Sequence, residues 1–215
     1  MATYVDATLG PTLLRIASPA AEPPRPVFAE SFTVSTVELD DTLNGTVSVR
    51  QVLRRDSTAR RSWMLANGTL VSGGLEEIMR CDIHPTGWFT TSGGSDATDP
   101  TSWACQNMSI NSDPQSCQWN LFWEPLPANA TYVGRESMDG RNCDRWTYWK
   151  WGEEYSLWAS ADTPNTPVAT GKISTFGGDH KWRILWRNFT AGAPPLSAFD
   201  PTPGIQCPPA NLTNN

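Results

Sequence analysis

Apolar and polar residues alternate along much of the chain with a period of two. The segment 46–53 shows this most clearly, because Val47, Val49 and Leu53 share one parity while polar side chains fill the other. Such alternation is typical of a β-strand with one buried face. No segment of twelve or more residues has a convincing helical period. The pattern therefore predicts an all-β protein of antiparallel strands with little helix.

Turn residues divide this pattern into short strands. The expected strands are 27–39, 46–53, 61–66, 70–71, 75–83, 118–123, 131–136, 145–151, 155–159, 168–176 and 181–189. The first changes the parity of its apolar residues partway along, which predicts a β-bulge. Asn67-Gly68 is expected to form the two-residue turn of a hairpin, since both central positions of a type I′ turn need positive φ. Residues 92–116 are polar and predict a long loop.

The chain of 215 residues suits a single all-β domain. A proline-rich stretch at 19–26 predicts a loose N-terminal arm over 1–26, since proline lacks a backbone donor and favours extended chain. The β domain is expected to span 27–209, followed by a disordered tail at 210–215.

The net charge of −6 argues against a nucleic-acid partner, which would require a basic surface. No stretch of 18 apolar residues is present, so no membrane span is predicted. The arrangement of the two histidines, His84 and His180, does not suggest a catalytic site, because neither lies near a nucleophile motif. We expect no enzyme activity, no metal site and no cofactor.

Sequons for N-glycosylation and scattered cysteines indicate an oxidising, secretory route. The six acceptor asparagines are Asn44, Asn67, Asn107, Asn129, Asn188 and Asn211. The five cysteines are Cys81, Cys105, Cys117, Cys143 and Cys207, and none forms a CxxC pair. We therefore predict a secreted glycoprotein with disulfides and one cysteine left over, although residues 1–30 lack the features of a signal peptide.

Tryptophans are concentrated in the last third of the chain. By strand alternation Trp149 and Trp151 share one face, and Trp182, Ile184 and Trp186 share a face of their own strand. These five residues are the expected lining of a hydrophobic ligand pocket. Two alternatives stay open: the tryptophans form ordinary core, or they are exposed platforms that stack on sugar rings.

Three features of the chain resemble the ependymin-related proteins. They are the run RSWMLANGTL leading to EEIMRCDI with Cys81 at its end, a late strand that ends at Phe189, and the tail FDPTPGIQCPP. The resemblance implies secreted or lysosomal glycoproteins in which antiparallel sheets curve into a half-barrel around a hydrophobic pocket. It also implies a non-catalytic role in binding a lipid or other hydrophobic molecule.

The same resemblance implies a disulfide between Cys81 and Cys207, and it implies that the protein can form a homodimer. Cys117 is then expected to pair with either Cys105 or Cys143. The alternative function is an extracellular carbohydrate-binding or adhesive module that uses exposed tryptophans.

Overall fold

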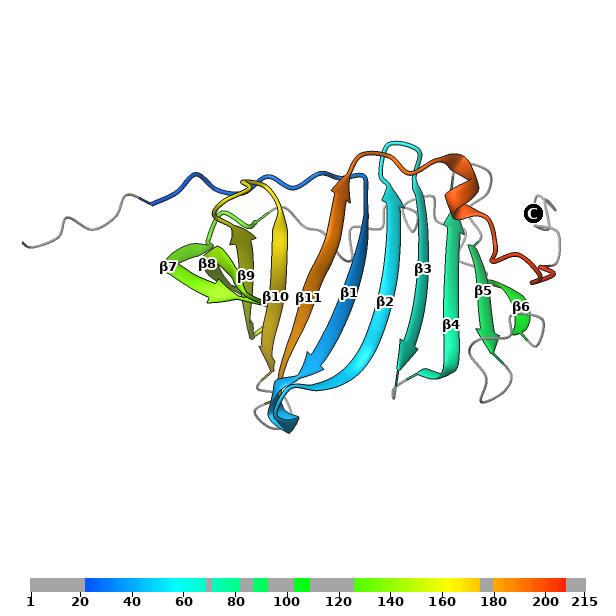
Figure 1. Ribbon diagram of the computed structural model, residues 1–215, viewed down its shortest axis with the longest axis horizontal. Coiled ribbons are helices and arrows are strands. Elements are labelled where there is room, and N and C mark those ends of the chain that lie inside the picture. Colours follow the sequence, from blue (N-terminus) through cyan, green and yellow to red (C-terminus); the bar gives the residue numbers. More distant parts are fainter. Residues whose placement is uncertain are drawn as a thin grey trace, which may run out of the picture.

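A computed structural model describes residues 22–68, 71–81, 87–92, 103–108, 126–174 and 180–207. They form one antiparallel sheet of eleven strands in the order β6-β5-β4-β3-β2-β1-β11-β10-β9-β8-β7 (Figure 1). The strands are β1 (Phe32–Asp40), β2 (Thr46–Asp56), β3 (Arg61–Gly68), β4 (Val71–Arg80), β5 (Gly87–Ser92), β6 (Trp103–Met108), β7 (Thr131–Met138), β8 (Arg141–Lys150), β9 (Glu153–Ser160), β10 (Pro167–Ser174) and β11 (His180–Ala191). Two short 3₁₀ helices are added, η1 (Asp41–Leu43) and η4 (Leu196–Phe199), and the described residues contain no α-helix.

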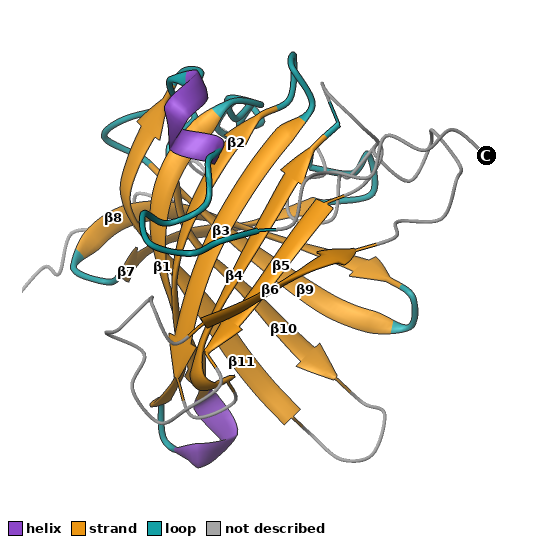
Figure 2. Cartoon of the chain, turned by 90° about the vertical axis from the view of Figure 1, so that its right-hand side faces the viewer, coloured by secondary structure: helices purple, strands orange, loops and turns teal. Residues whose placement is uncertain are grey.

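The sheet is twisted and curved but not closed, because β6 and β7 are its two edges (Figure 2). At one end the hairpin of β7 and β8 folds over the face that is turned to the reader in Figure 1, here called the front face. Arg187 on β11 binds Asp139 at the hairpin tip at 2.8 Å. Arg141 reaches the carbonyl of Trp186 at the same distance. These contacts link strands that are three places apart in the sheet, so the all-β half-barrel prediction is confirmed.

Both faces of the sheet carry buried apolar residues. The front face has one cluster around Val37, Trp158 and Leu185, and a second around Trp63 and Ile78. The opposite face, here the back face, buries Phe32 and its neighbours on β1, β2 and β11. The first strand can serve both faces because its pairing shifts register twice, which confirms the predicted bulge.

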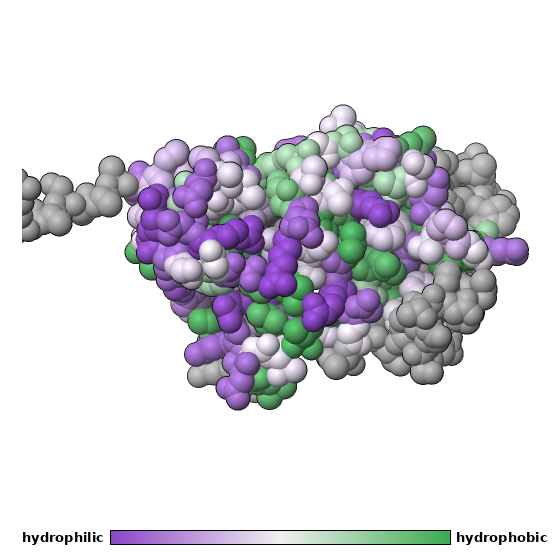
Figure 3. Space-filling model, in the orientation of Figure 1, coloured by the Kyte–Doolittle hydropathy of each residue, from purple (hydrophilic) through white to green (hydrophobic). Residues whose placement is uncertain are grey.

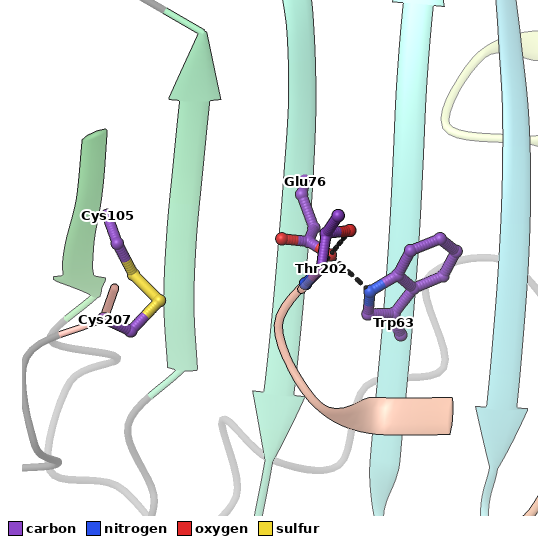
Figure 4. The surroundings of a disulfide bond; sticks show 5 residues. All are labelled: Trp63, Glu76, Cys105, Thr202 and Cys207. Carbon is purple, nitrogen blue, oxygen red and sulfur yellow. Dashed lines mark hydrogen bonds between the residues drawn. A yellow bond between two sulfur atoms is a disulfide. The ribbon is translucent and has the colours of Figure 1, made fainter. Parts of the chain in front are cut away.

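The C-terminal segment covers the front face of β3 and β4. Phe199 of η4 is fully buried against Trp63 and Ile78. Beyond it the carboxylate of Glu76, also fully buried, accepts hydrogen bonds from the backbone N–H and the hydroxyl of Thr202 and from the Trp63 indole (Figure 4). Because a buried charge needs such partners, these bonds fix the path of the tail.

That path makes the predicted pairing of Cys81 with Cys207 wrong. The tail crosses β4 and continues toward the β6 edge, where Cys207 forms a disulfide with Cys105 (Figure 4). Cys143 is a free thiol buried in the core, so its predicted disulfide is also wrong, and neither proposed partner is available to Cys117. Cys81 is disulfide-bonded, and Cys117 lies outside the described residues.

The strand predictions hold for most of the sheet, with two corrections. Strands β5 and β6 were not expected, and β6 lies inside the predicted loop 92–116. Asn67 and Gly68 end β3, and Gly68 pairs with Val71, so they are not the central pair of a two-residue turn. The expected strand 118–123 and the tail 210–215 lie outside the described residues.

Candidate functional site

The N-terminal arm is bound to the β7–β9 end of the sheet, so residues 22–26 are not loose as predicted. Arg25 donates hydrogen bonds of 2.9, 3.0 and 2.8 Å to the carbonyls of Pro127, Ala128 and Ala130. The N–H of Val27 binds the Asn165 side chain at 2.8 Å. Prolines flank Arg25 on both sides and hold the arm extended, so its single cation can reach these carbonyls.

A cavity of about 380 Å³ lies between this arm and the sheet, and we call it the arm cavity. This volume falls within the range of small-molecule sites, roughly 300–1,000 Å³. Most of its wall is apolar. The lining residues are Pro23, Pro24, Arg25, Pro26, Val27, Arg135, Asp144, Trp146, Ala159, Ser160, Ala161, Pro164 and Asn165.

Trp146 is the largest side chain in the wall of the arm cavity. It lies on the back face, because the adjacent residue Arg145 pairs with Trp158, which belongs to the front cluster. Its ring packs 5.3 Å from that of Tyr132, and the Arg25 guanidinium lies 5.6 Å from its centroid. The side chain is completely buried, yet its indole N–H has no hydrogen-bond partner. A buried donor without an acceptor is costly and rare. This nitrogen has almost no accessible surface, so it is not itself open to a molecule in the cavity.

A polar cluster forms one side of the same cavity. The buried carboxylate of Asp144 accepts a hydrogen bond of 3.1 Å from the Tyr132 hydroxyl and a bidentate pair of 3.1 and 3.3 Å from Arg135. Burial, and then this bond to Asp144, raise the pKa of Tyr132 above its ordinary value, so the phenol stays neutral. Within the described part of the chain, the Nη1 of Arg135 has no hydrogen-bond partner.

The predicted pocket residues on β8 are exposed and do not line the arm cavity. Trp149 is 60% exposed and Trp151 is 71% exposed. Trp151 has left the strand for the β8–β9 turn, with a φ of 53°, so the two do not share a strand face as predicted. Lys150 lies 3.8 Å from the centroid of the Trp151 ring.

The predicted pocket residues on β11 share the back face, but two of them pack as core. Ile184 and Trp186 belong to the cluster around Phe32, and the Trp186 indole donates to the Thr170 hydroxyl at 3.2 Å. Trp182 is half-buried, with the Lys172 ammonium 4.7 Å from its ring centroid. The structure therefore does not bring the five predicted residues together.

Sequence reasoning missed Trp146 as a site residue, although strand alternation places it on the opposite face of the strand from Trp149. The arm residues had no local signal, because their contacts lie about a hundred residues away in the chain. The four sequon asparagines in the described ranges, Asn44, Asn67, Asn129 and Asn188, are all exposed, while no side chain is described for Asn107 and Asn211.

The two histidines and the acidic side chains form no catalytic or metal site within the described residues. His180 is exposed and contacts the Thr42 hydroxyl at 3.3 Å, and His84 lies outside the described residues. Over the ranges that the structure covers, no three His, Cys, Asp or Glu side chains form a group that could hold a metal ion. No helix in these ranges is long and apolar enough to cross a membrane.

No family model matches this chain, and no curated protein does. Among solved structures, MucB in complex with MucA(peri) is similar over 84% of this chain at 13% identity and a TM-score of 0.45, and the match spans 57% of that chain. LprF from Mycobacterium bovis is similar over 76% of this chain and 88% of its own, at 13% identity and a TM-score of 0.42. A LolA superfamily protein from Nitrosomonas europaea is similar over 80% of this chain and 90% of its own, at 9% identity and a TM-score of 0.36. Membership of the ependymin-related family stays a prediction.

Proposed function

We propose that this protein is a non-catalytic binding module that takes up a hydrophobic molecule in the arm cavity. The observation that carries the proposal is the cavity of about 380 Å³ between the arm and the sheet, which has a mostly apolar wall and the Arg135–Asp144 pair on one side. The apolar walls would stabilise a hydrocarbon or aromatic body by removing it from water. The Nη1 of Arg135 would fix its orientation by donating to one oxygen.

The polar side of the cavity suggests what this oxygen belongs to. Arg135 keeps one guanidinium nitrogen available while its other donors hold Asp144. A carboxylate or ester at the end of an apolar chain could accept from Arg135. A fatty acid or a similar acyl compound combines such a group with an apolar body, so it is the ligand class that we propose.

We also propose that the protein works outside the cytosol as a glycoprotein. The Cys105–Cys207 disulfide ties the tail to the β6 edge, and disulfides persist in oxidising compartments. The exposure of the four sequon asparagines that can be assessed leaves them accessible to glycans. A lysosomal location would fit the same features.

Titration with a fluorescent fatty acid tests the proposed ligand class. Ala161→Leu places a larger side chain in the cavity wall, whereas Ala191→Leu makes the same change at an exposed position on β11. We expect the wild type and Ala191→Leu to bind the probe with equal affinity and Ala161→Leu to bind it at least tenfold more weakly. Equal affinity in all three proteins would refute the assignment of the site.

One observation favours a second candidate, an extracellular carbohydrate-binding module. Trp149 and Trp151 are large exposed side chains, and both lie at the β8–β9 tip. Exposed indoles can stack on sugar rings, although Lys150 already lies over the Trp151 ring. Specific binding on a glycan array that is lost in Trp149→Ala would support this function over the first.

A further inference from the structure

The front face has a shallow depression of about 200 Å³ that is separate from the arm cavity; we call it the front depression. Its apolar floor is made by Val37, Val52 and Leu65 on three adjacent strands. Figure 3 shows apolar side chains reaching the surface between polar ones over this part of the sheet. The lining residues are Ser35, Thr36, Val37, Arg50, Gln51, Val52, Leu65 and Asn67.

The depression lies between two covered parts of the front face. Val37 belongs to the cluster that the β7–β8 hairpin closes over. Val52 and Leu65 pack against the cluster that Phe199 covers. The strip between the two remains open and apolar, and its volume is below that of ordinary small-molecule sites.

One residue at the rim of the depression is a glycosylation acceptor. Asn67 is two residues after Leu65 on β3, so both side chains are on the same face, and Asn67 is exposed. The sequon needs glycine at its second position here, because a Cβ on Gly68 would lie 2.2 Å from the carbonyl oxygen of Ser48. This close approach to β2 holds the backbone of Asn67 at the rim.

We propose that the occupant of the front depression is the chain's own N-glycan, attached to Asn67. The first N-acetylglucosamine has an apolar ring face and an acetyl methyl group, which would pack on Val37, Val52 and Leu65. Its hydroxyl and amide groups would face the exposed Arg50 and the hydroxyl of Ser35 at the polar rim. The glycan would thus cover an apolar strip that no described residue covers, and this reduces the tendency to aggregate.

This inference rests on the proposed secretory route, but it does not require a ligand in the arm cavity. The protein is secreted from a eukaryotic host, and glycopeptide mass spectrometry measures the occupancy of Asn67. Asn67→Gln is then compared with Asn129→Gln, which removes a different exposed sequon at the edge next to β7. Neither substitution lies in the lining of the arm cavity. Binding of the fluorescent fatty acid therefore tests the proposed ligand site independently of the proposed glycan contact.

We expect Asn67 to be occupied. Asn67→Gln should gain one binding site for 1-anilinonaphthalene-8-sulfonate, whereas Asn129→Gln should gain none and fatty-acid binding should be unchanged in both. The extra site should disappear in Asn67→Gln combined with Leu65→Thr, because the apolar floor is then interrupted. An unoccupied Asn67 in the folded secreted protein, or equal dye binding by the two single variants, would overturn the proposal.

Discussion

Arg25 is the residue whose removal should most directly open the arm cavity. Its guanidinium donates three hydrogen bonds to carbonyl groups just before β7 and lies over the Trp146 ring. Arg25→Ala removes all of these contacts while leaving the sheet and its disulfide intact. We therefore expect the arm to detach locally without unfolding of the domain.

The size of the effect follows from the number and exposure of these bonds. A hydrogen bond to a charged group contributes about 1.5–3 kcal/mol when it is well shielded. Two of the three bonds are exposed to solvent, so their contributions are small. We therefore expect the free energy of arm closure to become about 2–3 kcal/mol less favourable in Arg25→Ala. This raises the ratio of open to closed arm about 30- to 150-fold.

Hydrogen exchange and ligand titration together measure this shift. Amide exchange in 22–31 and around Trp146 should accelerate in Arg25→Ala, and the Kd for the fluorescent fatty acid should rise, while the urea midpoint changes little. Arg25→Lys should have an exchange rate and a Kd between those of the wild type and Arg25→Ala, because one ammonium cannot satisfy three separated carbonyls. Wild-type exchange and wild-type Kd in Arg25→Ala would refute the conclusion that Arg25 holds the arm over the cavity.

Three further predictions concern the sheet. Thr202→Val should lower the free energy of unfolding by about 1.5–3 kcal/mol, because the Glu76 carboxylate loses a hydroxyl donor at 2.8 Å; a urea titration showing a loss under about 0.5 kcal/mol would contradict this. The hydrogen bond from Arg187 lowers the pKa of Asp139 below 3.8, so the ion pair is fully present above about pH 4 and is lost as the pH falls through the lower folded pKa. Asp139→Asn should therefore weaken the dependence of thermal stability on pH below about 4, and an unchanged acid profile would argue against the pair. Burial raises the pKa of the Cys143 thiol, which should react with a thiol reagent only after unfolding; rapid reaction of the native protein would contradict its burial.

The strands were predictable from the sequence because alternation is a local property. Segments such as 46–53 and 181–189 carry it within one strand, and both are strands in the structure. β5 and β6 were missed because they are short and lie among turn-forming residues. Their place in the sheet is set by pairing with β4, which no local pattern records.

The site and the disulfide were less predictable because both depend on distant contacts. The tail reaches Cys105 because Glu76 binds Thr202 at a separation of 126 residues, and the spacing of cysteines does not encode that route. Trp149 and Trp186 were predicted to line one pocket, but alternation alone cannot show which face of a strand meets a cavity. The cavity depends on the arm crossing Trp146, which is a tertiary feature.

Native mass spectrometry of protein secreted from eukaryotic cells tests the central claim most directly. The wild type should carry a reproducible added mass that organic extraction identifies as a fatty acid or acyl compound, and Ala191→Leu should retain it. Ala161→Leu, with the arm cavity partly filled, should be folded and should lose the added mass. A folded wild type that carries no such ligand and also ignores the fluorescent fatty acid would contradict the account.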